Sequence, residues 1–282
     1  MSEIPSQEEA LDRAVIALEP DSVHCVIVGG WALRLLARRP EAVPLPREPL
    51  VTTDLDVALR AERSTPATGE LDRRLADAGF VPVPSGSALP PVIAHVMQTS
   101  SGPFSVDFVS PLVGATRGRD GRERPTEVRL GVTAQRIARL QTALASTWSV
   151  THVVMDSETG HPREVGITVP SPAAYVDQKI LSMDDRPSRA KRERDLLYIA
   201  DALLLFNDAL PEIAATERPV IASSISARER ARLRARMRAL SVISDLHRGA
   251  ARQARDAGML PLDDVGNLVD TLAIGLQRLG DI

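Results

Sequence analysis

Cysteine, lysine and aromatic residues are all scarce in this chain of 282 residues. The single cysteine, Cys25, allows no disulfide within the chain, which excludes a small secreted scaffold held together by such bonds. Its position in an apolar run predicts a buried thiol rather than a nucleophile. Aromatic residues make up 3% of the chain, so the core must be built mainly from Leu, Val, Ile and Ala.

Two kinds of segment are also absent from the sequence. No apolar run approaches the roughly 20 residues that a membrane-spanning helix needs. The polar, acidic start of the chain has neither the basic nor the apolar region of a secretion signal. We therefore expect a cytoplasmic protein that makes no membrane contact.

Several common catalytic signatures are missing as well. The sequence contains no Walker-type loop with its lysine, no Ser-His-Asp signature and no zinc-binding cysteine cluster. Its five histidines have no metal-binding spacing. These absences argue against ATPases, hydrolases and zinc enzymes.

An apolar run that ends in two glycines, Gly29 and Gly30, is the first informative motif. A helical pattern follows directly. Glycines at the start of a helix let the backbone approach a phosphate, and the N–H groups and dipole there favour anions. A Gly-Gly pair alone is more often an ordinary turn.

Three aspartates in strand-like segments form the second motif. Asp54 and Asp56 are two residues apart, so both point to one face of a strand. Two carboxylates this close repel each other unless a cation lies between them, which indicates a divalent-metal site. Asp107 lies among apolar neighbours, where a carboxylate needs a partner or a metal. The alternatives are a solvated strand end for the first two and a water-facing position on an edge strand for Asp107.

Together these motifs resemble the DNA polymerase β-type nucleotidyltransferase superfamily over roughly residues 22–110. The resemblance implies that Asp54 and Asp56 bind two magnesium ions. It implies that Asp107 either ligates the metal that activates the acceptor hydroxyl or takes its proton. Gly29, Gly30 and the helix after them would hold the nucleoside triphosphate.

A second group of polar residues lies further along the chain. Only two lysines, Lys179 and Lys191, occur among the 34 basic residues, and both lie in one segment. The pattern there predicts helices over 171–183 and 189–206, joined by a loop that brings Lys179 within reach of Asp195. The pair is either a surface salt bridge, worth at most about 1 kcal/mol, or a lysine that neutralises triphosphate charge beside an acid that positions it.

This second group resembles the AbiEii-like nucleotidyltransferase toxins, including the mycobacterial MenT group, and extends the likeness to roughly residues 22–205. By that match Lys179 and Asp195 are catalytic, and Thr53 occupies the small hydroxyl position before the acids. Lys191 is a weaker candidate for nucleotide binding. The resemblance implies a toxin with an RNA acceptor, tRNA in particular, and an antitoxin partner. The proline-rich insert over 40–49 departs from the family's pattern.

An arginine-rich segment suggests how an RNA could be held. Residues 226–255 contain nine arginines against two acids, a local charge of +7 in a chain with a net charge of −3. Such a segment is either an ordinary solvated helix or an electrostatic contact for a nucleic-acid backbone. Aromatic residues for base stacking are absent from it, which disfavours sequence-specific reading.

The periodicity predicts a mixed α/β (α+β) protein. The expected strands are 23–28, 54–60, 91–99, 103–109, 150–155 and 164–169. The expected helices are 7–18, 30–38, 70–78, 171–183, 189–206, 226–256 in one or two pieces, and 263–279. A loop is expected over 117–125. We divide the chain into a catalytic lobe with a mixed sheet, residues 1–168, and a helical lobe, residues 169–282, that completes the active site.

These observations favour a magnesium-dependent nucleotidyltransferase that moves NMP from an NTP to an acceptor hydroxyl, with a tRNA 3′ end preferred. Two alternatives remain open. One is a small-molecule nucleotidyltransferase of the aminoglycoside or lincosamide type, and the other is a non-catalytic relative that binds nucleotide or a partner protein.

Overall fold

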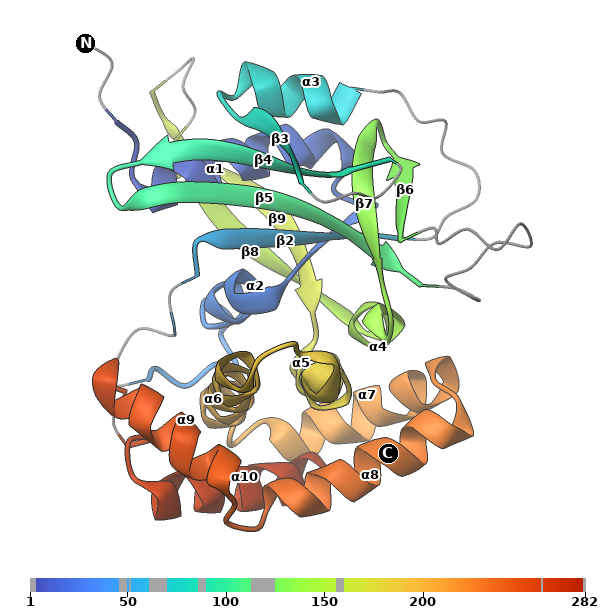
Figure 1. Ribbon diagram of the computed structural model, residues 1–282, viewed down its shortest axis with the longest axis vertical. Coiled ribbons are helices and arrows are strands. Elements are labelled where there is room, and N and C mark those ends of the chain that lie inside the picture. The colour runs from blue at the N-terminus through green and yellow to red at the C-terminus, as the bar shows by residue number, and fades with distance from the viewer. Residues whose placement is uncertain are drawn as a thin grey trace. The chain divides into compact units, whose positions relative to one another are not determined.

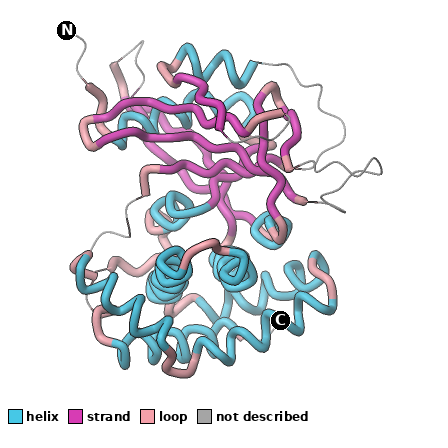
Figure 2. Tube along the Cα trace, viewed as in Figure 1, coloured by secondary structure: helices cyan, strands magenta, loops and turns pink. Residues whose placement is uncertain are grey.

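The computed structural model describes residues 4–45, 50, 52–60, 70–85, 90–112, 125–155, 160–259 and 261–280. The chain forms two compact units, and both are discontinuous in sequence (Figures 1 and 2). The sheet unit comprises Met1–Ala32, Thr52–Leu140 and Trp148–Val169. The helical unit comprises Leu33–Val51, Gln141–Thr147 and Pro170–Ile282. The division into lobes at residue 168 stays a prediction.

A mixed seven-stranded sheet forms the centre of the sheet unit. Its strands are β1 (Cys25–Val28), β2 (Asp54–Leu59), β3 (Val81–Ser85), β4 (Val92–Thr99), β5 (Gly102–Pro111), β6 (Thr126–Arg129) and β7 (Val132–Ile137). They run in the order β1-β2-β5-β4-β3, and β7 pairs with β5 and β6. The β2–β5 and β5–β7 pairs are parallel, and the other pairs are antiparallel.

The central strands β2 and β5 have one apolar face and one polar face. Leu55, Val57, Phe104, Val106 and Phe108 are buried on the apolar face, because alternate residues of a strand share a side. The Trp31 and Phe80 rings pack on Phe104 with centroid distances of 5.8 and 6.4 Å. This aliphatic and aromatic core fixes the register of the two strands, since a slip of one residue would expose it.

Helices and a second, smaller sheet complete this part of the chain. Helices α1 (Gln7–Leu18) and α3 (Glu70–Asp77) belong to the sheet unit. Helix α2 (Gly29–Leu36) begins in the sheet unit and ends in the helical unit, which also contains all of α4 (Leu140–Ala145) except its first residue. Strands β8 (Thr147–Met155) and β9 (Pro162–Pro170) pair with each other in a two-stranded sheet. Helix α1 begins at a capping box formed by Ser6 and Glu9, and it packs against α3, β4 and β5.

The helical unit is organised around a central helix that is buried over residues 195–203. Its helices are α5 (Pro172–Ser182), α6 (Arg189–Leu205), α7 (Leu210–Ser224), α8 (Ala227–Leu240), α9 (Asp245–Asp256) and α10 (Val265–Leu279). Helix α6 contacts α5, α9 and α10. Gly275 of α10 lies directly on Leu203 of α6, so a larger residue there would force the helices apart.

Most of the expected elements are confirmed, including the 91–99 and 103–109 hairpin as β4 and β5. The 226–256 region forms two helices, which the segment 241–244 separates. Strand β3 was not expected because it contains Pro82 and Pro84, which an edge strand tolerates. Helix α7 was also missed, and it contains Pro219.

The predicted loop over 117–125, except its last residue, and part of the proline-rich insert, 46–49, lie outside the described residues. Among the helices of the described ranges, none combines the length and apolar character that crossing a membrane requires.

Candidate active site

The three aspartates lie on the polar face of β2 and β5. The parallel pairing sets Asp54 opposite Ser105 and Asp56 opposite Asp107, so all four side chains share that face. Asp54 is exposed, whereas Asp56 and Asp107 are half-buried. Strand β5 is paired on both sides, by β2 and β4, so the edge-strand interpretation of Asp107 was wrong.

A serine hydroxyl connects two of the carboxylates. Ser105 Oγ lies 2.9 Å from Asp107 Oδ2 and 3.3 Å from Asp54 Oδ1. Thr53 Oγ1 also donates to Asp54 Oδ1, at 3.3 Å. The hydroxyls therefore hold the Asp54 and Asp107 side chains on the same part of the face.

Partial burial sets the acidity of Asp107. Burial raises the pKa of this carboxyl above its ordinary value, the Ser105 hydrogen bond lowers it in part, and the neighbouring Asp54 charge raises it further. A nearby cation would favour the charged form of Asp107. The site is thus electrostatically suited to a positive ion.

Gly29 lies against the Asp56 carboxylate. Its φ of +72° is one that other residues rarely adopt, and a Cβ at this position would collide with Asp56 Oδ2. Gly30 is buried in the first turn of α2. The structure therefore gives Gly29 a role that the sequence did not suggest, because its missing side chain makes room for Asp56.

The donor chemistry of this face fits magnesium, which prefers carboxylate and other oxygen ligands. Asp54, Asp56 and Asp107 supply only oxygen atoms, and they lie on two neighbouring strands. Within the described ranges, no three His, Cys, Asp or Glu side chains are already gathered so that they could hold one ion. Metal binding by all three aspartates would therefore require side-chain rotation, which the exposure of Asp54 allows.

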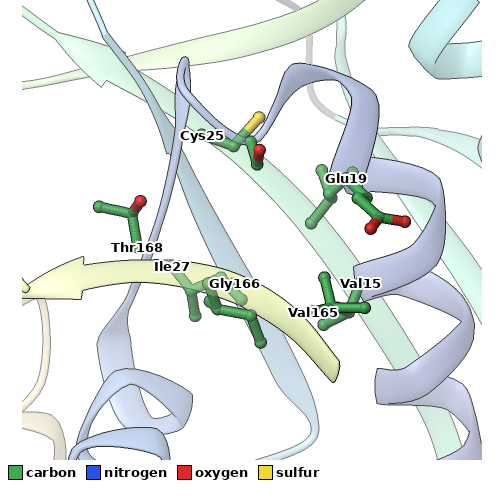
Figure 3. Close-up of a pocket in the computed structure, with 10 residues that line it drawn as sticks. Val15, Glu19, Cys25, Ile27, Val165, Gly166 and Thr168 are labelled. Carbon is green, nitrogen blue, oxygen red and sulfur yellow. The ribbon is translucent and has the colours of Figure 1, made fainter. Parts of the chain in front are cut away.

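A small pocket elsewhere in the sheet unit has a different character. It is lined mainly by apolar side chains of α1, β1 and β9, among them Val15, Ile27 and Val165 (Figure 3). Cys25 contributes to its wall, and burial raises the pKa of this thiol to about 12, so it stays protonated at neutral pH. The prediction that Cys25 is a buried structural thiol is confirmed.

The helical unit holds the second predicted pair. Lys179 Nζ of α5 donates to Asp195 Oδ1 of α6 at 2.7 Å, and both side chains are 4% exposed. The interpretation as a surface salt bridge was therefore wrong, because the pair is buried. Arg186, from the turn between the helices, adds Nε and Nη2 contacts to Asp195 at 2.5 and 3.3 Å. One carboxylate thus holds two cations.

The environment of this pair explains its charge state. Burial alone would raise the pKa of Asp195, but the Lys179 ammonium and the Arg186 guanidinium hold it below the ordinary value. The Lys179 ammonium also lies 4.6 Å from the centroid of the Tyr198 ring, which adds a cation–π contact. Arg186 is 36% exposed, so it is the cation of this group that solvent reaches most readily.

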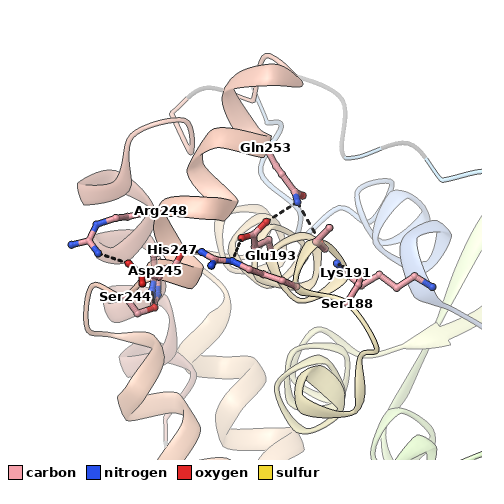
Figure 4. Close-up of polar contacts among 10 residues, drawn as sticks. Ser188, Lys191, Glu193, Ser244, Asp245, His247, Arg248 and Gln253 are labelled. Carbon is pink, nitrogen blue, oxygen red and sulfur yellow. Dashed lines mark hydrogen bonds and ion pairs between the residues drawn. The ribbon is translucent and has the colours of Figure 1, made fainter.

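Lys191 does not belong to this group. It is exposed in the first turn of α6, where its backbone N–H donates to the Ser188 side chain at the helix N-terminus. Figure 4 shows its side chain extending away from Glu193, whose carboxylate accepts hydrogen bonds from Arg189 and Gln253.

Several arginines of the 226–255 segment are engaged within the helical unit. Arg232 and Arg236 both contact Asp184, in the same turn as Arg186. Arg230 donates to two carbonyl groups at the end of α7. Leu233, Met237, Leu240 and His247 are buried between these arginines. The arginines are therefore not one uniform cationic surface.

A mixed sheet with three aspartates on one face of neighbouring parallel strands, beside a glycine that opens a helix, is the arrangement that the resemblance to the polymerase β-type nucleotidyltransferases implies. The model of the NTP_transf_8 nucleotidyltransferase family matches residues 10–218, and the chain belongs to this family. It is accordingly a nucleotidyltransferase, with a nucleoside triphosphate as the substrate from which NMP is transferred.

Among curated proteins the chain has no match. An antigenic nucleotidyltransferase-like protein from Paracoccidioides brasiliensis is similar over 72% of this chain and 78% of its own, with 18% identity and a TM-score of 0.38.

Sequence reasoning missed two residues of these groups, Ser105 and Arg186. Ser105 is two residues before Asp107, and the alternation of β5 places it on the same face, so the signal was present in the sequence. Arg186 lies in the turn that joins the two predicted helices, and no periodicity indicates where such a side chain points.

Proposed function

We propose that this nucleotidyltransferase uses magnesium to transfer NMP from an NTP to the 3′ hydroxyl of an RNA, tRNA in particular, as the toxin of a toxin–antitoxin pair. The observation that carries the magnesium-dependent chemistry is the shared face of Asp54, Asp56 and Asp107 on β2 and β5. The acceptor and the biological setting rest on the resemblance of the motifs to AbiEii-like toxins.

The proposed reaction is an in-line displacement. The acceptor oxygen forms a bond to the α-phosphorus, the bond from that phosphorus to the bridging oxygen of pyrophosphate breaks, and the acceptor loses its proton. Magnesium ions held by Asp54 and Asp56 would neutralise the developing charge. Asp107 would either ligate the metal that activates the acceptor hydroxyl or take the proton that this hydroxyl loses.

Other residues are assigned to the nucleotide. The first turn of α2, with Gly29 and Gly30, supplies N–H groups to the phosphates. Lys179 offsets triphosphate charge, and Asp195 positions it through the 2.7 Å contact between them. Thr53 holds Asp54, and Lys191 stays a weaker candidate on an exposed turn.

The arginines of α8 and α9 support an RNA acceptor. Arg228, Arg238 and Arg252 are exposed, and phosphate contacts by such side chains supply much of the affinity for nucleic acids. An antitoxin protein would be the natural regulator of such an activity.

A labelling experiment tests the proposal. The purified protein is incubated with magnesium, each α-labelled NTP in turn and total tRNA. We expect label to appear on RNA with the wild type and to disappear with Asp56→Ala. The matched control is Asp77→Ala, which removes an exposed aspartate of α3 that pairs only loosely with Arg73 at 3.4 Å.

Label on RNA that persists in Asp56→Ala would contradict the role of the aspartates. Absence of label on RNA with all four nucleotides would overturn the RNA acceptor. Protein and aminoglycoside-type acceptors would then be tested with the same variants.

A further inference from the structure

We propose that Ser105 is a positioning residue of the nucleotidyl-transfer site, whose hydroxyl sets the orientation of the Asp107 carboxylate for a divalent cation, while the exposed Asp54 stays free to rotate. The inference rests on the proposed magnesium-dependent function and adds to it a residue outside the three aspartates.

The strand register makes Ser105 the residue between the acids. It lies opposite Asp54 in the parallel β2–β5 pair and two residues before Asp107 on its own strand. Its backbone N–H donates to the Thr53 carbonyl at 3.0 Å, so the main chain at Ser105 is tied to β2. A short side chain fixed at this point reaches both carboxylates.

The contacts of the hydroxyl are specific to the acids. Within the described residues, Ser105 Oγ makes its side-chain hydrogen bonds to Asp107 Oδ2 at 2.9 Å and Asp54 Oδ1 at 3.3 Å. A hydroxyl has one proton, so it donates to one carboxylate at a time. The 2.9 Å contact makes Asp107 the principal acceptor, and this bond limits the rotation of that carboxylate.

Hydrogen bonds to metal-binding carboxylates influence affinity because they fix the ligand before the ion arrives. Loss of such a partner typically weakens metal binding by roughly 10–100-fold. Without the Ser105 hydroxyl, Asp107 would turn more freely, and the repulsion from Asp54 would favour orientations that separate the two charges. The free energy needed to bring the two carboxylates together would then reduce the affinity for the metal.

The test measures Mn²⁺ binding, as a paramagnetic substitute for Mg²⁺, by electron paramagnetic resonance on the full-length protein. We expect Ser105→Ala to weaken Mn²⁺ affinity by roughly 10-fold. Ser105→Thr keeps the hydroxyl and should restore most of the affinity. In the transfer assay, Ser105→Ala should require more Mg²⁺ for half-maximal rate and recover when Mg²⁺ is raised.

Ser110→Ala is the matched control. Ser110 lies on the same strand but five residues further on, so it faces the opposite side of the sheet and is fully buried. This change should leave Mn²⁺ affinity unaltered. Wild-type Mn²⁺ affinity in Ser105→Ala, or equal losses in Ser105→Ala and Ser105→Thr, would overturn the inference.

The result also separates this inference from the proposed function. If Mn²⁺ binds the wild type and is lost in Asp56→Ala but not in Ser105→Ala, the metal site stands and Ser105 has no positioning role. If the wild type binds no Mn²⁺, the magnesium-dependent function fails and the inference about Ser105 fails with it.

Discussion

The acid face of β2 and β5 (Asp54, Asp56 and Asp107) and the Lys179 group of the helical unit (Lys179, Arg186 and Asp195) are both polar. Their charges are balanced in opposite ways. On the acid face, three carboxylates carry the same charge, and the Thr53 and Ser105 hydroxyls hydrogen-bond two of them, Asp54 and Asp107. In the Lys179 group, one buried carboxylate is held by an ammonium and a guanidinium. We expect the first arrangement to bind an external cation, whereas the second contains its own cations.

This difference separates function from stability. Like charges on one face raise the free energy of the folded protein, so they favour binding of a cation that neutralises them. A buried ion pair whose partners are both present contributes little net stability, but removal of one partner leaves an uncompensated charge. We therefore expect changes on the acid face to affect transfer and changes in the Lys179 group to affect folding.

The largest expected effect is on transfer in Asp56→Ala. Loss of a ligand that helps to stabilise transition-state charge should lower the rate by about 1,000-fold. The free energy of unfolding should change much less, because the Asp56 side chain is only half-buried. Urea unfolding beside the labelling assay checks both, and a marked loss of stability would break the contrast between the two groups.

The Lys179 group should show the reverse pattern in stability. Asp195→Ala leaves Lys179 buried without its acid and should cost about 3–5 kcal/mol of unfolding free energy. Lys179→Met should cost less, because Arg186 still compensates Asp195. Urea unfolding of both variants provides the measurement, and an equal or larger loss in Lys179→Met would contradict the shared-carboxylate arrangement.

The same pair predicts a pH dependence. The pKa of Asp195 is lower in the folded protein than in the unfolded chain, so its ionised form stabilises the fold. That contribution is fully present above the ordinary aspartate pKa of about 3.9 and is lost as the pH falls through the folded value. Below pH 4, the free energy of unfolding of the wild type should fall more steeply with decreasing pH than that of Asp195→Asn, as urea unfolding at a series of pH values measures.

A smaller loss of stability is expected on substitution of Gly29, which contacts Asp56 on the acid face. Gly29→Ala should lose about 2 kcal/mol of stability, because φ is +72° and the new Cβ collides with Asp56. Gly160→Ala is the matched control, since Gly160 has φ of +67° and open space around its Cβ position. Only Gly29→Ala should also impair transfer, and equal transfer rates in the two variants would argue against the Asp56 contact.

The smallest effects concern the arginines of α8. Arg232→Ala should change stability by less than about 1 kcal/mol, because its ion pair with Asp184 is partly exposed. The double variant Arg228→Ala and Arg238→Ala should instead make the plot of log affinity for RNA against log salt concentration less steep. The change in slope should correspond to the loss of about two phosphate contacts. Filter binding across a salt series distinguishes them, and an unchanged slope would exclude these two side chains from the RNA contact.

Much of the helix and strand pattern could be predicted because it depends on local periodicity. The alternation around Asp54, Asp56 and Asp107 places each acid on a polar strand face, and the apolar spacing of α6 predicts its helix. The strand that was missed, β3, is one whose residues have a low intrinsic preference for strands. Pro82 and Pro84 concealed β3, since prolines are tolerated there only because β3 is an edge strand.

The sequence by itself therefore determined the nucleotidyltransferase motifs, the paired acids of β2 and the helices that carry Lys179 and Asp195. Only the tertiary structure decided that β2 pairs in parallel with β5, which brings Ser105 and Asp107 beside Asp54 and Asp56. It also decided that Lys179 is buried and that Arg186 shares its carboxylate. The reason is physical: periodicity fixes which face a residue occupies, whereas its neighbours on that face depend on pairing between distant segments.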